Sequence, residues 1–146
     1  MYSHILISTD GSELAQKGIE HGLSLAKALG SKVTVITVTD PFPIIYGRTW
    51  QPTPELSSRF EEENKNAAAE IFSKVKAIAD KVGVAVDTLH IADAPAANAI
   101  LEAASELECS LIVMSSHGRS GVAKMLLGSQ TSKVVSNSSV PVLVIR

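Results

Sequence analysis

Two polar segments carry residue types that could bind a phosphorylated ligand. The first is Thr-Asp-Gly-Ser at residues 9–12, and the second is Ser-Ser-His-Gly at residues 115–118. Ten residues beyond the second, Gly128-Ser129 lies at or near the expected start of a helix. Glycine lets a backbone approach a ligand closely, and the N–H groups at a helix start favour an anion. The Ser129 hydroxyl adds a donor.

Asp10 has the wrong charge for a phosphate, but a carboxylate suits a ribose hydroxyl or a divalent cation that bridges phosphates. Both segments also have an ordinary explanation. Glycine is common in turns after strands, and Asp-Gly-Ser often precedes a helix. Whether these residues form one site depends on the elements that position them.

The hydrophobic period alternates between strand-like and helix-like along the chain, which is typical of a βαβ architecture. Strands are expected at residues 4–8, 32–39, 84–91, 111–114 and 140–145. Helices are expected at residues 12–30, 55–82, 95–107 and 129–136. Because crossovers between parallel strands are right-handed, this pattern predicts an α/β fold with a five-stranded, mostly parallel open sheet and helices on both faces. Residues 1–146 are expected to form a single domain.

In such a sheet a ligand binds beyond the carboxyl ends of the strands, where the strand order reverses. If the order is 3-2-1-4-5, the reversal lies between the first and fourth strands. Those strands end in residues 9–12 and 115–118. The strand order would therefore bring the two polar segments together.

Composition excludes several classes of function. The chain has 146 residues, 45% hydrophobic and 19% charged, and a net charge of −2. It has no basic run for nucleic acid and no apolar run long enough for a membrane. The first residues do not resemble a signal peptide, and Cys109 is the only cysteine. We therefore expect a cytoplasmic protein, with Cys109 as a buried packing thiol rather than a reactive one.

Little in the sequence indicates an enzyme. There is no Walker-type glycine loop and no G-x-S-x-G motif, and no cluster has metal-ligand spacing. His4, His21 and His90 are expected to be structural or surface residues. His117, inside the polar segment, could contact a phosphate or shape the loop. We predict no catalytic residues and no protein-bound metal.

The whole chain resembles the universal stress protein family, whose fold is adenine nucleotide alpha hydrolase-like. The resemblance lies in Ile5–Ser12, in Val113–Gly121, in Leu126–Ser129 and in Ser139–Val144. Nucleotide-binding members carry Gly, two residues, Gly, nine residues, then Gly-Ser or Gly-Thr. Here Gly118 and Gly128-Ser129 fit that spacing, while Ser115 replaces the first glycine.

The resemblance implies an adenine nucleotide, ATP or else AMP or ADP, with Mg²⁺ carried by the phosphates. Asp10 would contact the ribose or the metal-linked phosphates, Thr9 would line the base pocket, and the Val38 backbone would read the adenine edge. Met114 would pack near the ribose or base. The phosphates would be surrounded by Ser115, Gly118, Gly128, Ser129 and the Gln130 backbone.

The resemblance also implies a homodimer formed through the last strand, residues 140–145, which would cover an exposed sheet edge. Three functions stay open: an ATP-binding regulatory module of the stress response, a member that binds no nucleotide and acts through protein partners, and an enzyme such as an ATP pyrophosphatase. Ser115 favours the second. The segment 40–54, rich in proline and aromatic residues, is either a lid over the nucleotide or a partner-binding loop, and Arg119 and Lys124 are either phosphate ligands or solvated cations.

Overall fold

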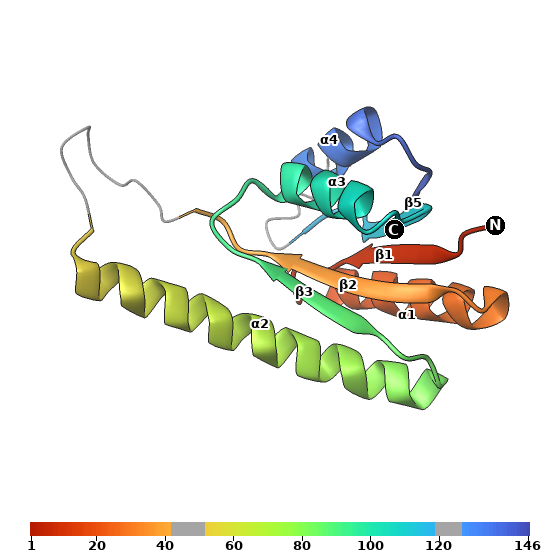
Figure 1. The fold of residues 1–146 in the computed structure, drawn as a ribbon, viewed down its shortest axis with the longest axis horizontal. Coiled ribbons are helices and arrows are strands. Elements are labelled where there is room, and N and C mark those ends of the chain that lie inside the picture. Colours follow the sequence, from red (N-terminus) through yellow and green to blue (C-terminus); the bar gives the residue numbers. More distant parts are fainter. Residues whose placement is uncertain (42–51, 119–126) are drawn as a thin grey trace.

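The computed structural model describes residues 1–41, 52–118 and 127–146 (Figure 1). Strands and helices alternate along these residues. The strands are β1 (His4–Ser8), β2 (Lys32–Val38), β3 (Asp87–Ile91), β4 (Leu111–Ser115) and β5 (Val142–Ile145). The helices are α1 (Glu13–Leu29), α2 (Pro54–Val82), α3 (Ala96–Glu106) and α4 (Ser129–Asn137).

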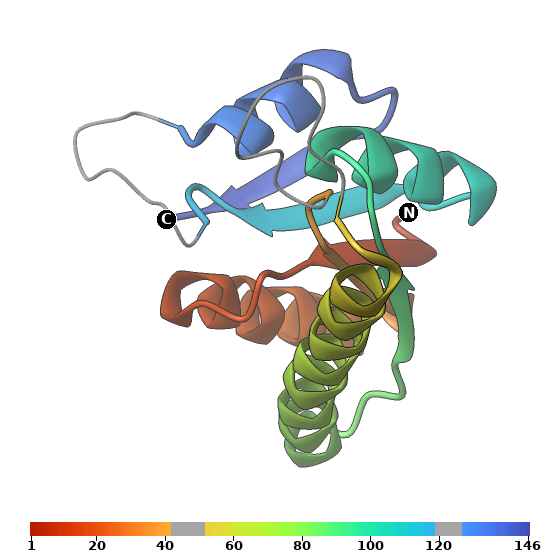
Figure 2. The same cartoon turned by 90° about the vertical axis from the view of Figure 1, so that its left-hand side faces the viewer.

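All five strands belong to one sheet of order β3-β2-β1-β4-β5, and every neighbouring pair is parallel. This confirms the predicted fold class and strand order. In Figure 2, α1 and α2 lie on one side of the sheet, and α3 and α4 lie on the other. The order reverses at the pair β1 and β4, whose register joins Ile5 to Leu111 and Ile7 to Val113.

Alternation along β1 divides the core between the two helical layers. Ile5 and Ile7 pack in a cluster with α1 and α2, while Leu6 packs in a second cluster with α3 and α4. All three side chains are fully buried. A strand that is covered on both faces has no polar side, so its sequence is a continuous apolar run.

The ends of α1 are fixed by the residues that the sequence indicates. The Ser12 hydroxyl accepts the N–H of Ala15 at 3.1 Å, and Gly30 ends the helix in the left-handed conformation with φ of 67°. On the face toward the sheet, a Cβ at Gly22 would lie 2.5 Å from Cδ1 of Ile7. Gly22 therefore allows α1 to approach β1 closely.

Two strands begin later than the hydrophobic pattern predicts. β3 begins at Asp87 rather than Val84, because the N–H of Val84 still bonds the carbonyl of Ala79 in the C-terminal cap of α2. β5 begins at Val142 rather than Val140, because the Ser138 hydroxyl bonds both the N–H and the carbonyl of Val140 in a turn. Apolar side chains made the expected strands longer at their N-terminal ends, but local hydrogen bonds hold those residues in a helix cap and a turn.

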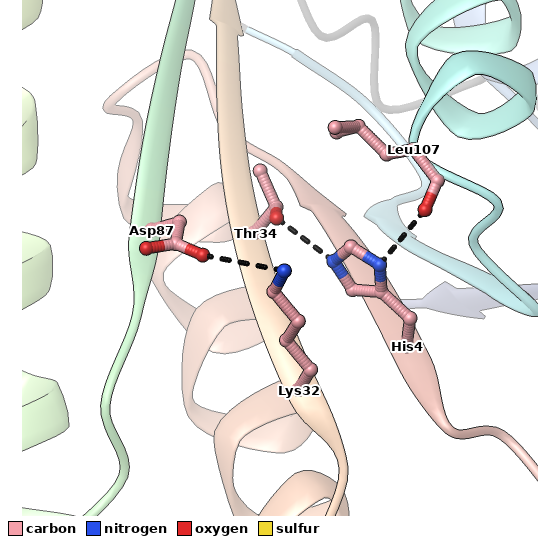
Figure 3. Close-up of polar contacts among 5 residues, drawn as sticks. All are labelled: His4, Lys32, Thr34, Asp87 and Leu107. Atoms are coloured by element: carbon pink, nitrogen blue, oxygen red, sulfur yellow. Dashed lines mark hydrogen bonds and ion pairs between the residues drawn. The ribbon is translucent and has the colours of Figure 1, made fainter.

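His4 is a structural residue, as expected. His4 is the first residue of β1 and is 8% exposed, and its ring bridges Leu107 and Thr34 (Figure 3). Nδ1 lies 3.0 Å from the Leu107 carbonyl, which can only accept, so Nδ1 carries the proton. In the neutral ring, Nε2 then accepts the Thr34 hydroxyl at 2.9 Å. The nearby ion pair of Lys32 and Asp87, at 3.9 Å and well exposed, adds little stability.

The predicted segment 40–54 lies mostly outside the described residues, which include only its two ends. Within residues 1–41, 52–118 and 127–146, no helix has the length and apolarity needed to cross a membrane.

Candidate functional site

The two polar segments meet at the carboxyl ends of β1 and β4. These neighbouring strands end at Ser8 and Ser115, and the chain then continues as residues 9–12 and 115–118. Asp10 and Gly118 lie side by side there: a Cβ at Gly118 would lie 2.7 Å from Asp10 Oδ2. Glycine at position 118 thus lets the second segment lie directly against the Asp10 carboxylate.

Asp10 is held by its own turn. Its Oδ1 accepts the N–H of Ser12 at 2.9 Å, and Thr9 Oγ1 accepts the N–H of Gly11 at 3.2 Å. Gly11 has φ of 81°, which favours glycine at this position. The turn places a half-exposed carboxylate above the switch point of the sheet, where it could bond a hydroxyl or a cation.

The segment after β4 is fixed on several sides by hydrogen bonds. The N–H of Ser116 donates to the Ile145 carbonyl at 2.8 Å, and the carbonyl of Ser116 accepts the N–H of Gly128 at 2.7 Å. The Ser115 hydroxyl donates to the His117 carbonyl at 2.8 Å. This network joins β4, β5 and the start of α4.

Gly128 is the N-cap residue of α4, as the sequence indicates, and a Cβ there would lie 3.1 Å from the Ser116 carbonyl oxygen. Ser129 and Gln130, both exposed, follow in the first turn. The first N–H groups of a helix have no acceptor within the helix. Together with the helix dipole they make the start of α4 suited to an anion.

The side chain of Gln130 has a role that the sequence analysis missed. Its Oε1 accepts the N–H of Ala97 at 3.0 Å and so caps α3, whose N-cap residue Pro95 makes no side-chain cap bond. The bond joins residues 33 positions apart. No local sequence signal indicates it.

Val38 presents its backbone at the same end of the sheet. The Ile36 carbonyl accepts the N–H of Thr9, whereas the N–H of Thr39 donates to Ile91 on the opposite side. Backbone groups alternate in direction along a strand. The N–H and C=O of Val38 therefore face the β1 side, beyond the last β1–β2 pair of Ser8 with Ile36.

Thr9 and Met114 are buried, at 6% and 5% exposure. Met114 belongs to the core cluster under α3 and α4. Thr9 lines a cavity of about 190 Å³ between α1 and α2, together with Ser12, Gln16 and residues of α2. The structure therefore brings Asp10, residues 115–118, the start of α4 and the Val38 backbone to one end of the sheet. It does not bring Thr9 and Met114 together, because Thr9 faces the α1–α2 layer and Met114 faces the α3–α4 layer.

Among the remaining expectations, His117 Nδ1 lies 3.1 Å from the Ser116 hydroxyl within its own segment. Arg119 and Lys124 lie outside the described residues. In the part of the chain that the structure describes, no group of three or more His, Cys, Asp or Glu side chains could hold a metal ion.

This parallel sheet, with helices on both faces and polar segments and a helix start at its switch point, has a doubly wound α/β architecture. The family model of the universal stress protein family matches residues 1–146. A universal stress protein of Methanocaldococcus jannaschii is 34% identical over 146 residues, with 100% of this chain and 83% of the relative covered. The universal stress protein YxiE of Bacillus subtilis is 31% identical over 155 residues, with 100% of each covered.

Solved structures agree on the fold. The universal stress protein UspA from Lactobacillus plantarum has a TM-score of 0.81 at 25% identity, covering 99% of this chain and 98% of that chain. A universal stress protein in complex with cAMP has a TM-score of 0.70 at 23% identity, covering 99% and 97%. One from Archaeoglobus fulgidus in complex with dAMP has a TM-score of 0.61 at 20% identity, covering 99% and 98%. The chain belongs to the universal stress protein family.

Proposed function

We propose that this protein binds an adenine nucleotide, ATP in the first place, and acts as a regulatory module rather than an enzyme. One observation carries the proposal. The Asp10 carboxylate, Gly118 and the start of α4 converge where the strand order reverses, with Gly118 against Asp10 and Gly128 bonded to Ser116. The cAMP and dAMP complexes of two proteins with this fold support an adenine ligand.

The residues present fit such a ligand. Gly118 and Gly128 have little space for a Cβ, at 2.7 Å from Asp10 Oδ2 and 3.1 Å from the Ser116 oxygen. The backbone N–H groups of Ser129 and Gln130 at the start of α4 would receive the phosphates. The N–H and C=O of Val38 face the β1 side beyond the last β1–β2 pair, and they form a donor–acceptor pair suited to the adenine edge. Asp10 would bond a ribose hydroxyl or Mg²⁺ that accompanies the phosphates.

The first experiment is to purify the protein without added nucleotide, denature it, and identify released ligands by mass spectrometry. Calorimetric titration of the stripped protein with Mg·ATP follows. We expect released AMP, ADP or ATP, or a micromolar affinity. Asp10→Ala should weaken binding tenfold or more, because a hydrogen bond to a charged group contributes about 1.5–3 kcal/mol. Gly128→Val should also weaken it, since its side chain would crowd the Ser116 carbonyl.

The matched control is Asp80→Ala, which removes the same charge from an exposed position near the end of α2. It should bind ATP as the wild type does. A folded protein that releases no nucleotide and gives no heat up to millimolar ATP would refute the proposal. The protein would then be a member that acts only through protein partners.

We also propose that the protein is a homodimer formed through β5. β5 lies at the edge of the sheet, and Leu143 on it is 38% exposed. The carbonyls of Pro141 and Ile145 point toward β4, where they accept the N–H groups of Ile112 and Ser116. By alternation, the N–H of Val144 faces the open edge. A second copy of β5 could pair there and cover that edge.

Val144→Pro tests the dimer because proline removes this N–H. The bonds that the Pro141 and Ile145 carbonyls accept do not involve it. Light scattering should give a dimer for the wild type and for the control Val144→Ala, and a folded monomer for Val144→Pro. A wild-type monomer at all concentrations, or a dimer unaffected by proline, would exclude this interface.

A further inference from the structure

Ser115 occupies the position where the nucleotide-binding motif described above has glycine, and its hydroxyl is bonded within its own segment. Ser115 is 8% exposed, and its hydroxyl donates to the His117 carbonyl at 2.8 Å. Along β4, Val113 packs with the α1 layer and Met114 with the α3–α4 layer. By alternation, Ser115 projects toward α1, on the opposite face from α4.

This bond fixes the direction of the peptide that joins His117 to Gly118. A trans peptide directs its C=O and the following N–H to opposite sides. Because the His117 carbonyl points to the Ser115 hydroxyl, the Gly118 N–H points away from that hydroxyl. The carbonyl oxygen, which would repel a phosphate, is thereby bonded to Ser115.

The rest of Ser115 is fixed as well. Its carbonyl accepts the hydroxyl of Thr131 at 2.9 Å, and Thr131 lies in the first turn of α4 at 3% exposure. Ser115 therefore connects the segment after β4 to the helix start that would receive the phosphates.

We propose that Ser115 is a positioning residue for nucleotide phosphates: its hydroxyl holds the His117 carbonyl so that the Gly118 N–H stays directed toward the ligand. The inference rests on the proposed function. It reverses the expectation that Ser115 marks a member unable to bind nucleotide. Ser115 lies in β4 without a positive φ, so its backbone needs no conformation that favours glycine.

The test compares wild type, Ser115→Ala and Ser115→Gly in calorimetric titrations with Mg·ATP and with adenosine. Both variants should bind ATP about threefold to tenfold more weakly, the loss expected for one hydrogen bond. Adenosine has no phosphate, so its affinity should not change. A residue needed only for folding would affect both ligands, or neither.

Ser110→Ala is the matched control. Its hydroxyl donates to the His4 carbonyl at 3.2 Å and accepts the His4 N–H at 3.3 Å at the opposite end of β4, so this variant loses side-chain hydrogen bonds far from the site. ATP affinity should be unchanged in this variant. Hydrogen exchange of residues 115–118 without ligand should be faster in Ser115→Ala than in wild type, which tests the bond independently of nucleotide.

The outcomes separate the two proposals. ATP binding by wild type that both Ser115 variants retain within twofold, or tighter binding by Ser115→Gly, would overturn the positioning role alone. Absence of ATP binding by the folded wild type would overturn the proposed function and this inference with it.

Discussion

Replacing Gly22 by alanine tests how closely α1 packs on the central strand. The new Cβ would lie 2.5 Å from Ile7 Cδ1, 2.9 Å from Ile7 Cγ1 and 3.6 Å from Val113 Cγ1. Alanine in a helix interior gains about 0.5–1 kcal/mol over glycine. Overpacking of a core costs about 1–3 kcal/mol, and Ile7 is fully buried. We expect a net loss of up to about 2.5 kcal/mol in the free energy of unfolding.

Gly18→Ala, one helical turn earlier, should have the opposite sign. Its Cβ would meet only the Ser115 nitrogen at 3.7 Å and the Met114 carbonyl carbon at 3.9 Å, which are ordinary contacts. The helix gain of about 0.5–1 kcal/mol should then remain nearly whole. The two substitutions are chemically identical and lie on the same helix, so propensity cannot explain a difference between them.

Urea unfolding followed by circular dichroism gives both changes by linear extrapolation. Ile7→Val removes the Cδ1 atom, so it should be less costly in the Gly22→Ala background than in wild type. The reasoning is refuted if Gly22→Ala is at least as stable as wild type, or if Gly18→Ala is the less stable of the two. Additive effects of Gly22→Ala and Ile7→Val would also contradict it.

Three further predictions concern buried side chains. His4→Ala should lower the free energy of unfolding by about 1–3 kcal/mol, because it leaves the buried Thr34 hydroxyl without its ring partner; an unchanged urea midpoint would contradict this. Burial raises the pKa of the Cys109 thiol to about 11. At pH 8 a thiol reagent should therefore modify the native protein about a hundredfold more slowly than the unfolded protein, and equal rates would exclude a packing role. Burial lowers the pKa of His90 below its usual 6.5, so the unfolded chain takes up the proton first as the pH falls. The stability that His90 contributes is complete above about pH 6.5 and decreases as the pH falls toward its folded pKa. The free energy of unfolding in urea should therefore fall less between pH 7.5 and 5.5 in His90→Gln than in wild type. Parallel pH profiles of the two proteins would contradict this prediction.

Local features of the sequence determined most of the elements. Ser12, Gly30 and Gly83 delimit α1 and α2 because capping depends on a few neighbouring residues and on positive φ. The apolar run 111–114 identified β4 because a strand buried on both faces needs apolar side chains throughout. The spacing of Gly118 and Gly128-Ser129 also indicated a site, since backbone approach and helix starts leave local signals.

Only the tertiary structure decided how these parts meet. The strand order that brings Asp10 against Gly118 depends on pairing between β1 and β4, more than a hundred residues apart, and right-handed crossovers alone allow other orders. The bond from Gln130 to Ala97 and the direction of the Ser115 hydroxyl have no local signal. Each depends on where a distant partner, or a turn of the backbone, places an acceptor. A single hydroxyl at position 115 could therefore suggest a blocked site in the sequence and a bonded, inward-turned side chain in the fold.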